Sequence, residues 1–453
     1  MNSRLRRFTA LLLGVTLSAG MLAGCGSSSG NSAANTSTSA ATNSGTAAQT
    51  EQTMSEPVNV VFWNLFNGGD ATMGQQIFDE YNQKNPNVKI EFQQQDNAQY
   101  YTKLKTAIMA GTGPDFAMSH VGGFLSGMAE EGNILPLDEL NTKYNSGIQF
   151  DKYTKSVMEA VKVDGKTYAV PMDNLVRVLM YNKALLKDTG LIGPDGNLVL
   201  DKGYDNFVKA LDAVKAKNPS VSPLVINMGA AQHVLQWLTL YYQMGGVDFV
   251  DVNAKKVTFD EAKALEALKA YKNLYDNYVP PKLVSPAEFN LFKAKKAAFL
   301  IDGSWNVGAA AEALGDDFGV TVFPQLFEKE ALATTNQAFI IPIKEGRTEA
   351  QEKEILTFIK YWGENNWKWS QAGHLPAYEP SAETPEFKAL PYPKSYIDTM
   401  KIGIPLPIVP NINVHQAVEV NGPIQKAVLG MSTPEQAIKD VKANLENYMS
   451  KLN

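Results

Sequence analysis

Cysteine is nearly absent from this chain: Cys25 is the only one among 453 residues. A single cysteine excludes an internal disulfide, and a free thiol would be a liability in an oxidising compartment. No set of cysteines and histidines has the spacing of a metal site, and there is no P-loop and no Rossmann glycine fingerprint. The sequence therefore predicts no metal and no cofactor.

Arginine and runs of positive charge are also scarce. The chain has 41 basic and 47 acidic residues, which gives a net charge of −6. A mildly acidic chain without basic clusters is not expected to bind nucleic acid or anionic lipid. Three of the arginines stand at positions 4, 6 and 7, and only Arg177 and Arg347 follow them. Arg347 is expected to be a solvated loop charge, whereas Arg177 either forms a salt bridge within its own segment or reaches a ligand.

The first 24 residues have the pattern of a secretory signal. The three arginines precede an apolar run from Phe8 to Leu22, and Leu22-Ala23-Gly24-Cys25 follows. This order predicts a signal peptide over residues 1–24 that is cleaved and does not remain as a membrane span. Leu-Ala-Gly-Cys looks like a bacterial lipobox, in which the cysteine becomes the lipidated first residue of the mature protein. Cys25 is therefore the expected lipidation site, and the lipid is the expected contact with the membrane.

Residues 25–57 are expected to form a flexible tether. From Gly26 onward they are mainly Ser, Thr, Ala, Asn and Gly, and no charge occurs before Glu51. Such a segment has too little apolar surface to offset the entropy lost on ordering. The expected location of the folded body is the extracellular face of a cell membrane, and the tether together with the lysine-rich body suggests a Gram-positive cell.

The folded part, about 400 residues, is long enough for two lobes. Its beginning alternates strand and helix: Val58 to Trp63 is an apolar strand, the next helix carries an apolar face, and "VKIEF" and "DFAMSH" form further strands. This alternation predicts a parallel sheet, in which ligands bind at the carboxyl ends of the strands. The residues expected at those ends are Trp63, Asn64, Phe66, Asn67, Asp70, Asp96 and His120.

The remainder alternates in the same way. Asp164-Gly165 is expected to form a hairpin turn, and Val176 to Tyr181 an extended segment. Helical patterns cover residues 204–216, 231–243, 261–278 and 349–361, and strand patterns occur in "AAFLID", "FGVTVF" and "QAFIIPI". A last helical region runs from about Gly422 to the end, with Thr433 as a helix cap.

Several motifs together resemble the extracellular solute-binding proteins of ABC importers, in the sugar-binding branch that includes maltose-binding protein. In chain order they are "FDEYNQKNPNVKIEF", "AGTGPDF", "DGKTYAVPMD" with "LMYNKALL", "FLIDGSW", "FIIPI", "AGHLPA" and "STPEQAI". The resemblance implies an α/β, type II periplasmic-binding-protein-like fold, with a ligand cleft between two lobes. Carried over, lobe 1 holds 58–172 plus 325–372 and lobe 2 holds 173–322 plus 373–453, and Val170 to Tyr181 is one of the crossings.

The corner "IDGSW" is the strongest site candidate. Sugars present flat C–H faces and polar edges, so a sugar site needs aromatic platforms together with carboxylates, amides and imidazoles. In the sugar-binding relatives the tryptophan of an Ile-x-Gly-x-Trp element lines the cleft, and Ile301 to Trp305 matches that spacing. Trp305 is therefore the expected platform and Asp302 an expected hydroxyl partner. The alternative is that Trp305 closes the core of its lobe.

Further candidates lie in the crossings and at the ends of elements. Relatives often place a ligand-pairing carboxylate in the crossing, and Asp173 and Asn174 occupy it here. The remaining candidates are Arg177, His233, Trp237, Asn336, Gln337 and His374. Lone histidines are more often structural than functional, and the same alternative holds for each histidine in this set.

The sequence thus predicts a receptor that is not an enzyme. This receptor, expected to be a monomer, would capture a carbohydrate in the cleft between its lobes and deliver it to the permease subunits of an ABC transporter. The expected carbohydrate is an oligosaccharide. One alternative is a secreted carbohydrate-active enzyme, which would need two carboxylates at a defined separation. Another is a binding protein for a non-sugar solute. The sequence leaves open which sugar is bound.

Overall fold

The computed structural model describes residues 57–97 and 99–452. Cys25, the expected signal peptide and almost all of the expected tether lie outside this range. Within the described ranges no helix combines the length and the apolar character that crossing a bilayer requires.

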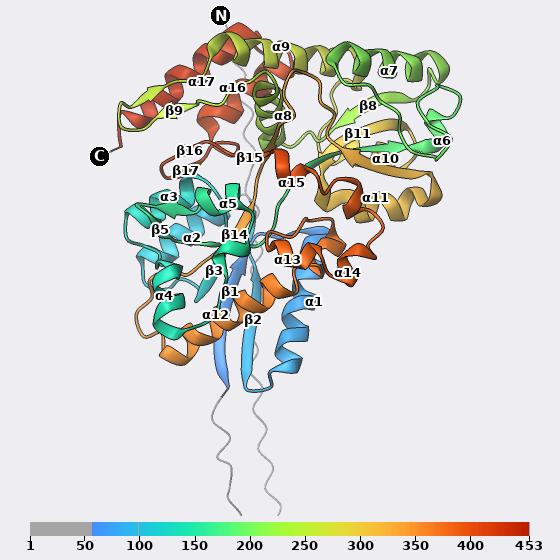
Figure 1. The fold of residues 1–453 in the computed structure, drawn as a ribbon. Coiled ribbons are helices and arrows are strands. Elements are labelled where there is room, and N and C mark those ends of the chain that lie inside the picture. Colours follow the sequence, from blue (N-terminus) through green and yellow to red (C-terminus); the bar gives the residue numbers. More distant parts are fainter. Residues whose placement is uncertain (1–56, 98, 453) are drawn as a thin grey trace, which may run out of the picture. The chain divides into compact units, whose positions relative to one another are not determined.

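The first sheet has five strands in the order β2-β1-β3-β14-β6 (Figure 1). Strand β1 pairs in parallel with β2 and β3, which confirms the predicted parallel arrangement. Strand β14 is antiparallel to both of its neighbours. The strands are β1 Val58–Asn64, β2 Val88–Gln94, β3 Phe116–His120, β6 Val170–Pro171 and β14 Gln337–Ile340.

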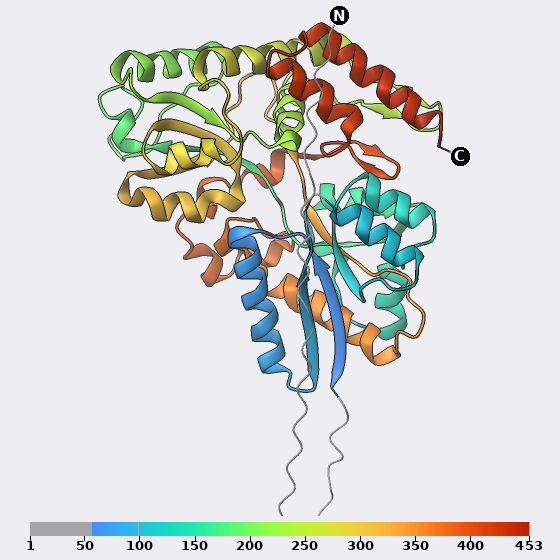
Figure 2. The same ribbon diagram turned by 180° about the vertical axis from the view of Figure 1, so that it is seen from behind.

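Helices cover both faces of this sheet because their apolar stripes need burial. Helix α1 packs on β2 and α12 on β1, and Figure 2 shows α1 beside the strands from behind. Helix α12 begins with a complete capping box, in which Thr348 and Gln351 satisfy each other's backbone N–H groups. The helices of this part are α1 Gly68–Lys84, α2 Tyr100–Met109, α3 Gly123–Glu130, α4 Leu137–Tyr144, α5 Lys155–Ala160 and α12 Glu349–Glu364.

The second sheet has four strands in the order β12-β7-β11-β8. Strand β7 lies antiparallel between β12 and β11, whereas β11 and β8 are parallel. Every residue of β7 and β11 is buried, which is why both read as continuous apolar runs in the sequence. The strands are β7 Arg177–Asn182, β8 Ser222–Ile226, β11 Ala297–Gly303 and β12 Phe318–Val322.

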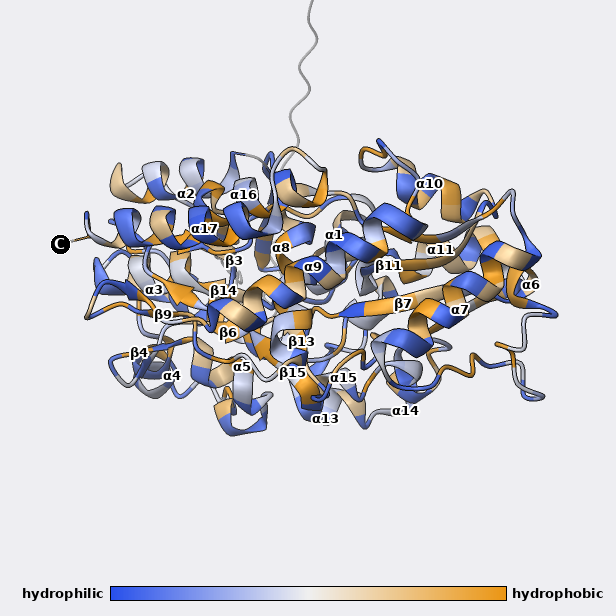
Figure 3. Cartoon of the chain, turned by 90° about the horizontal axis from the view of Figure 1, so that it is seen from above, coloured by the Kyte–Doolittle hydropathy of each residue, from blue (hydrophilic) through white to orange (hydrophobic). Residues whose placement is uncertain are grey.

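The helices around the second sheet show the expected amphipathic pattern. Figure 3 shows hydrophobic and hydrophilic colours alternating along α7 and α9. These helices are α6 Lys183–Leu186, α7 Tyr204–Lys217, α8 Ala230–Gln243, α9 Glu261–Tyr278, α10 Ala287–Lys293, α11 Val307–Leu314, α16 Val418–Val428 and α17 Pro434–Met449. Thr433 caps α17 as predicted.

The remaining elements are short and connect these parts. The predicted hairpin turn at Asp164-Gly165 joins β4 Lys162–Val163 to β5 Lys166–Thr167. The other short strands are β9 Val250–Asp251, β10 Lys256–Val257, β13 Leu332–Thr334, β15 Gly403–Pro405, β16 Ile408–Val409 and β17 Ile412–Asn413. The short helices are α13 Glu379–Ala382, α14 Pro385–Lys388, α15 Thr399–Ile402, η1 Phe150–Lys152, η2 Ser304–Asn306, η3 Gly315–Asp317, η4 Trp369–Ala372 and η5 Pro393–Ser395.

Each sheet has its own hydrophobic core, and the chain passes between the two cores in segments that lie side by side. These crossing segments are residues 172–176, 334–337 and 373–377. Asn174 and Leu375 exchange two backbone hydrogen bonds, and Met172 N donates to Gln337 O at 2.7 Å. The crossings are therefore joined by backbone pairing as well as by chain connectivity.

The lobe boundaries expected from the resemblance differ from these cores. Leu326 and residues 331–333 pack in the core of the second sheet. The return to the first sheet therefore falls near residue 334 and not at 325. Ala377 packs in the core of the first sheet, although it lies beyond the expected boundary at 373. The resemblance implies these boundaries only approximately, and the apolar contacts of the short loop segments decide to which core each segment belongs.

The charge expected at Arg347 is also placed differently. Its side chain is only 2% exposed, and it donates a 2.8 Å hydrogen bond to the carbonyl oxygen of Asp115. Lys344 forms a 2.7 Å ion pair with the carboxylate of Asp115. Arg347 is thus part of a buried polar cluster at the start of β3, and the expectation of a solvated loop charge is wrong.

A glycine-lined contact joins α3 to the β16–β17 hairpin, which packs with the second core. A Cβ on Gly123 would lie 1.7 Å from the carbonyl oxygen of Val409. Asn411 N also donates to Gly123 O at 2.7 Å. Because the obstacle is backbone, the hairpin can approach α3 this closely only where the helix has no side chain.

We expect Gly123→Ala to lower the free energy of unfolding by about 1–3 kcal/mol, the usual cost of overpacking. The matched control is Gly308→Ala in α11, an exposed position where the nearest atom to a Cβ is the carbonyl oxygen of Gln371 at 3.8 Å, an ordinary contact. That substitution should stabilise the protein by about 0.5–1 kcal/mol because alanine is the better helix former. Urea unfolding measures both, and equal effects of the two substitutions would contradict the tight contact.

Candidate functional site

A cavity of about 310 Å³ lies where strands of both sheets end. It adjoins the carboxyl ends of β1 and β3 from the first sheet and of β8 and β11 from the second, as the strand-end rule predicts. Its lining residues are Leu65, Phe66, Asn67, Asp70, Asn97, His120, Leu175, Asn227, Ala231, Gln232, Leu235, Trp305, Thr335, Gln337, His415 and Gln416. Six of the predicted site residues are among them: Phe66, Asn67, Asp70, His120, Trp305 and Gln337.

A larger open groove of about 720 Å³ lies between α5, α13 and α15. Its lining contains no strand residue, and six of its eleven residues carry exposed charges, of which Lys401 and Asp398 pair with each other. The smaller cavity is therefore the better candidate site, because only there do buried polar groups and aromatic rings of both sheets converge.

Trp305 lies at the strand-to-helix corner because Gly303 leaves room for it. A Cβ on Gly303 would lie 1.7 Å from the indole ring, so the ring lies directly over the glycine backbone. Trp305 is only partly buried and lines the cavity. The spacing Gly-x-Trp therefore has a physical cause: the glycine lets the indole fold back over the strand end and present its other side to the cavity.

Asp302 was expected to pair with a ligand hydroxyl, but it does not line the cavity. It is fully buried, and it accepts hydrogen bonds from Asn227 Nδ2 at 2.6 Å, Gly303 N at 2.7 Å and Asn306 Nδ2 at 2.8 Å. Burial raises the pKa of its carboxyl, and these three hydrogen bonds oppose the shift. Asp302 thus fixes the amide of Asn227, which does line the cavity.

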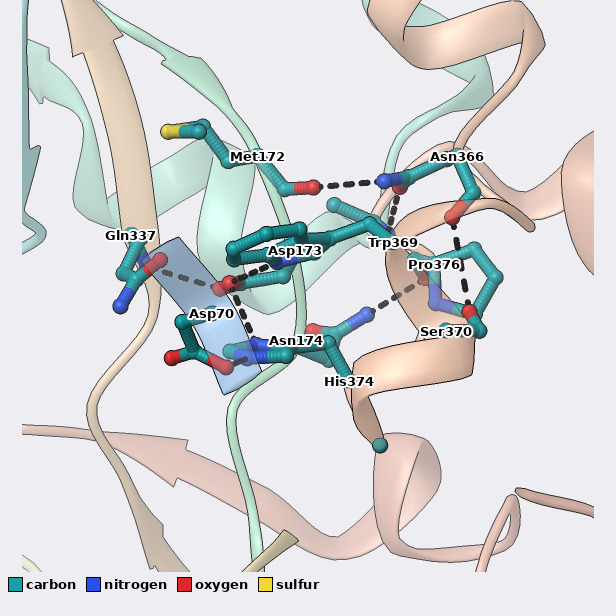
Figure 4. A network of polar contacts seen from close by, with 12 residues as sticks. Asp70, Met172, Asp173, Asn174, Gln337, Asn366, Trp369, Ser370, His374 and Pro376 are labelled. Atoms are coloured by element: carbon teal, nitrogen blue, oxygen red, sulfur yellow. Dashed lines mark hydrogen bonds and ion pairs between the residues drawn. The ribbon is translucent and has the colours of Figure 1, made fainter. Parts of the chain in front are cut away.

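A chain of buried polar groups connects the cavity to the crossing segments (Figure 4). Asp173 Oδ2 accepts hydrogen bonds from Trp369 Nε1 at 3.0 Å and from His374 Nδ1 at 2.9 Å. On its other side, His374 Nε2 lies 3.0 Å from Asp70 Oδ1. Asp173 Oδ1 accepts from Gln337 N at 2.9 Å. One buried carboxylate therefore holds two cavity residues, Gln337 directly and Asp70 through His374.

His374 bridges two carboxylates and is itself fully buried. Burial alone would lower its pKa, but the charge of Asp70 and the hydrogen bonds to Asp173 and Asp70 outweigh it and raise the pKa to about 10. His374 is therefore an imidazolium at neutral pH, with both ring nitrogens donating. His374 and Asp173 were predicted to contact a ligand, and they lie one layer behind the cavity.

The raised pKa of His374 makes stability depend on alkaline pH. The folded state holds this proton more tightly than the unfolded chain, whose histidine pKa is 6.5. The contribution is therefore complete below pH 6.5 and is lost as pH rises toward 10, by at most about 1.4 kcal/mol per pH unit. We expect urea unfolding of the native chain to show this loss between pH 6.5 and 10. His374→Gln should remove it, and an unchanged slope in that variant would contradict the assignment.

Two neutral histidines in the lining of the cavity contact each other. His120 is the last residue of β3 and pairs with Gln337 in the sheet register. Its Nδ1 forms a 2.6 Å hydrogen bond with the Tyr101 hydroxyl. His415 follows β17, and its ring lies edge-on to that of His120 with centroids 5.3 Å apart. Burial lowers the pKa of His120 to about 4 and the pKa of His415 well below 6.5. Both rings thus offer uncharged hydrogen-bonding groups at neutral pH.

Arg177, His233 and Trp237 were predicted site residues, and none of them lines the cavity. Arg177 is buried behind Gln232 and donates to its side-chain oxygen, and burial lowers the pKa of its guanidinium to about 10. His233 Nδ1 lies 2.7 Å from the Tyr271 hydroxyl. Trp237 Nε1 donates to Ala264 O at 2.8 Å. The last two belong to the interior face of α8, a helix buried over most of its surface.

The other predicted residues that miss the cavity stabilise the loops around it. Trp63 donates to Gln93 Oε1 at 2.9 Å, and Asn64 accepts from Phe66 N at 3.1 Å. Asp96 is exposed and accepts from Gln99 N at 3.1 Å. Asn174 donates to Thr154 Oγ1 and to Pro376 O, both at 2.9 Å. Asn336 is buried and does not line the cavity.

Sequence reasoning missed several lining residues. Asn227 directly follows β8 and could have been found by the same strand-end rule that found His120. Leu175 and Asn97 are the immediate neighbours of the predicted Asn174 and Asp96. Gln232 lies in the first turn of α8, and His415 and Gln416 come from a loop far along the chain. No local pattern in the sequence indicates that Gln232, His415 and Gln416 line the cavity.

Comparisons with known proteins agree with this geometry. A family model described as bacterial extracellular solute-binding protein matches residues 68–368, which is more than half of the chain. The chain is 24% identical over 271 residues to the maltotriose-binding protein of Pyrococcus abyssi, which covers 59% of this chain and 54% of that protein. It is 23% identical over 367 residues to the galactooligosaccharide-binding protein of Bacillus subtilis, which covers 79% and 82%.

Solved structures show the same fold. An ABC transporter solute-binding protein of Thermotoga lettingae, bound with α-D-tagatose, has a TM-score of 0.71 at 21% identity, and the match covers 86% of this chain and 100% of that one.

Proposed function

Because the chain belongs to the family of bacterial extracellular solute-binding proteins and has their two-sheet α/β fold, we propose that it captures a carbohydrate in the cavity between the two sheets. The ligand we infer is an oligosaccharide, which the protein would deliver to the permease subunits of an ABC transporter. The two curated relatives named above bind maltotriose and galactooligosaccharides, and both names support this ligand class.

The observation that carries the proposal is the lining of the cavity. Trp305 offers an aromatic face from one sheet, and Asp70, His120 and Gln337 offer polar groups from the other side. Gln337 Oε1 is buried and accepts no hydrogen bond within the described residues. Buried polar atoms usually have partners, so such an acceptor is suited to a ligand hydroxyl. An apolar platform with convergent amides, imidazoles and a carboxylate suits the alternating faces and edges of a sugar ring.

The carboxylates in and near the cavity favour a protein that binds the sugar without hydrolysing it. A glycosidase needs a pair of them flanking the scissile bond. Among the described residues of the lining, Asp70 carries the one carboxylate. The next carboxylate in the network, that of Asp173, is fully buried and already accepts three hydrogen bonds. The family and its structural neighbours are binding proteins, and we infer that this chain is one as well.

The proposal extends to where the protein works. A lipid on Cys25 would hold the folded body at the outer face of the cell membrane, with residues 26–57 as the tether, in a cell that we infer to be Gram-positive. The protein would act as a monomer, because the two sheets that form the cavity belong to one chain. Globomycin treatment of producing cells tests the anchor, since it should leave the signal segment uncleaved.

A thermal-shift screen of purified protein over maltotriose, galactotriose, chitotriose, xylotriose and mannotriose tests the function. A ligand at 100 times its Kd should stabilise the folded state by about 2.7 kcal/mol and raise Tm measurably. Chromatography of the same mixtures should recover each trisaccharide intact. A screen without any shift would contradict the carbohydrate proposal, and turnover of the bound sugar would favour an enzyme.

A further inference from the structure

The cavity carries one ionised side chain among the described residues of its lining, the carboxylate of Asp70. Its other polar groups are amides, one hydroxyl and the two imidazoles of His120 and His415, whose pKa values are lowered by burial. No lysine or arginine is part of the lining. A ligand in this cavity therefore meets a single negative charge and no lining cation.

Asp70 is held in place from behind. It stands in the first turn of α1, where the helix dipole favours a negative charge. Its side chain is 13% exposed, and its Oδ1 lies 3.0 Å from His374 Nε2. The other nitrogen of His374 is bonded to Asp173 at 2.9 Å. Two carboxylates thus share one imidazolium, so the group as a whole keeps one negative charge, and Asp70 is the end of it that faces the cavity.

The second charged pair near the cavity does not cancel this charge. Arg177 and Asp302 both lie behind the lining and are at most 4% exposed. Arg177 bonds to the side chain of Gln232, and Asp302 to Asn227, so a neutral amide stands between each charge and the cavity. Arg177 is positive and Asp302 is negative, so their charges oppose each other. The charge that acts in the cavity is therefore mainly that of Asp70.

We propose that this cavity is selective by charge: it accepts neutral and amine-bearing sugars and rejects sugars with a carboxylate or phosphate, with Asp70 as the determinant and His374 as the residue that positions it. This inference rests on the proposed carbohydrate function. Rejection works through repulsion, because an anionic ligand would bring a second negative charge into a low-dielectric site beside the first. A neutral sugar instead donates its hydroxyls to the carboxylate in charge-assisted hydrogen bonds.

The test compares sugars that differ in charge and little else. Calorimetric titrations would use maltotriose and galactotriose, their uronates with one C6 hydroxymethyl group oxidised to a carboxylate, and their 6-amino-6-deoxy derivatives, all of which keep every ring closed. For the native chain we expect each uronate to bind at least 10-fold more weakly than its parent, and each amine to bind at least as well as its parent. Asp70→Asn keeps the shape and an acceptor for His374 but removes the charge, so the 10-fold ratio should shrink to less than 3-fold.

Asp79→Asn is the matched control. It removes the same charge from the same helix, but Asp79 is exposed and bonds only to Gln75. The ratio of neutral to anionic affinity should stay within 2-fold of the native value. If Asp79→Asn reduces the ratio as much as Asp70→Asn does, the selectivity comes from the overall charge of the protein, and the proposal is overturned.

The role of His374 is tested through Asp70. His374→Gln should weaken binding of the neutral trisaccharide about 10-fold in the native chain, but less than 2-fold when Asp70→Asn is already present, because a positioning residue acts through its partner. A merely structural role would give the same loss in both backgrounds. Nitrogen NMR of His374 adds a readout that needs no sugar, and a neutral imidazole at pH 8 would overturn the proposal.

The outcomes separate this inference from the proposed function. If no neutral sugar binds, the carbohydrate function fails and this inference fails with it. If maltotriose or galactotriose binds and its uronate binds equally well, the function stands and the charge selectivity is wrong.

Discussion

We expect Trp305→Ala to raise the Kd of the proposed oligosaccharide ligand by at least about 30-fold, the loss of about 2 kcal/mol or more that is usual when an aromatic anchor of a binding site is truncated. The indole is partly exposed and lies over Gly303, so its removal takes away the apolar platform of the cavity while most of the core stays intact. Titration calorimetry measures the affinity, and urea unfolding of the free protein measures the stability, which should fall by less than about 1.5 kcal/mol.

Gly303→Ala is the companion variant, because it keeps the indole and displaces it. The new methyl group would overlap the ring of Trp305 at 1.7 Å, so the ring must leave its position over the strand end. We expect a loss of affinity within a few-fold of that of Trp305→Ala. A large drop in stability with unchanged affinity in both variants would show instead that Trp305 closes the core of the second sheet.

His374→Ala has the largest expected effect on stability, about 3–5 kcal/mol. The substitution removes an imidazolium that is bonded to two carboxylates, and it leaves Asp173 buried at 0% exposure without its counter-ion. Urea unfolding measures the loss.

The matched control is His233→Ala. His233 is equally buried, but it is neutral, and its one described partner is the Tyr271 hydroxyl. We expect His233→Ala to lower the free energy of unfolding by about 1–3 kcal/mol less than His374→Ala does. Both variants leave a cavity of similar size, but only His374→Ala leaves an unpaired buried charge. Equal costs for the two histidines would mean that the ion-pair chain contributes nothing to stability.

The fold could be predicted well from the sequence because its strands leave clear patterns. The buried strands β3, β7 and β11 contain apolar runs, and β1 and β2 are partly buried strands with apolar residues in alternation. All five lie where the patterns predicted them. The crossings were harder to place. Residues 326–333 have no strong pattern of their own, and only their apolar contacts show that they pack with the second sheet.

The site could be predicted in part, and the errors have two physical causes. The first is side-chain direction: in extended segments adjacent residues point to opposite sides, so Asn174 points toward Thr154 while its neighbour Leu175 lines the cavity. On a helix that is buried nearly all round, such as α8, the spacing of residues does not tell which face meets a ligand. Trp237 was therefore predicted as a site residue although it does not line the cavity, and Gln232, which does, was missed.

The second cause is layering. Three residues with the chemistry of ligand-binding groups instead position residues of the lining. Asp173 bonds to Gln337, His374 to Asp70, and Asp302 to Asn227. A sequence shows which residues can form hydrogen bonds but not how many layers separate them from the cavity. His415 shows the reverse case, since its contact with His120 joins positions almost 300 residues apart.

A crystal structure of the protein with the trisaccharide that gives the largest thermal shift tests the central claim most directly. The account predicts a sugar ring stacked on the indole of Trp305 at van der Waals distance, with a hydroxyl bonded to the carboxylate of Asp70. A sugar bound elsewhere, for instance in the groove between α5, α13 and α15, with the indole free of contact, would contradict it.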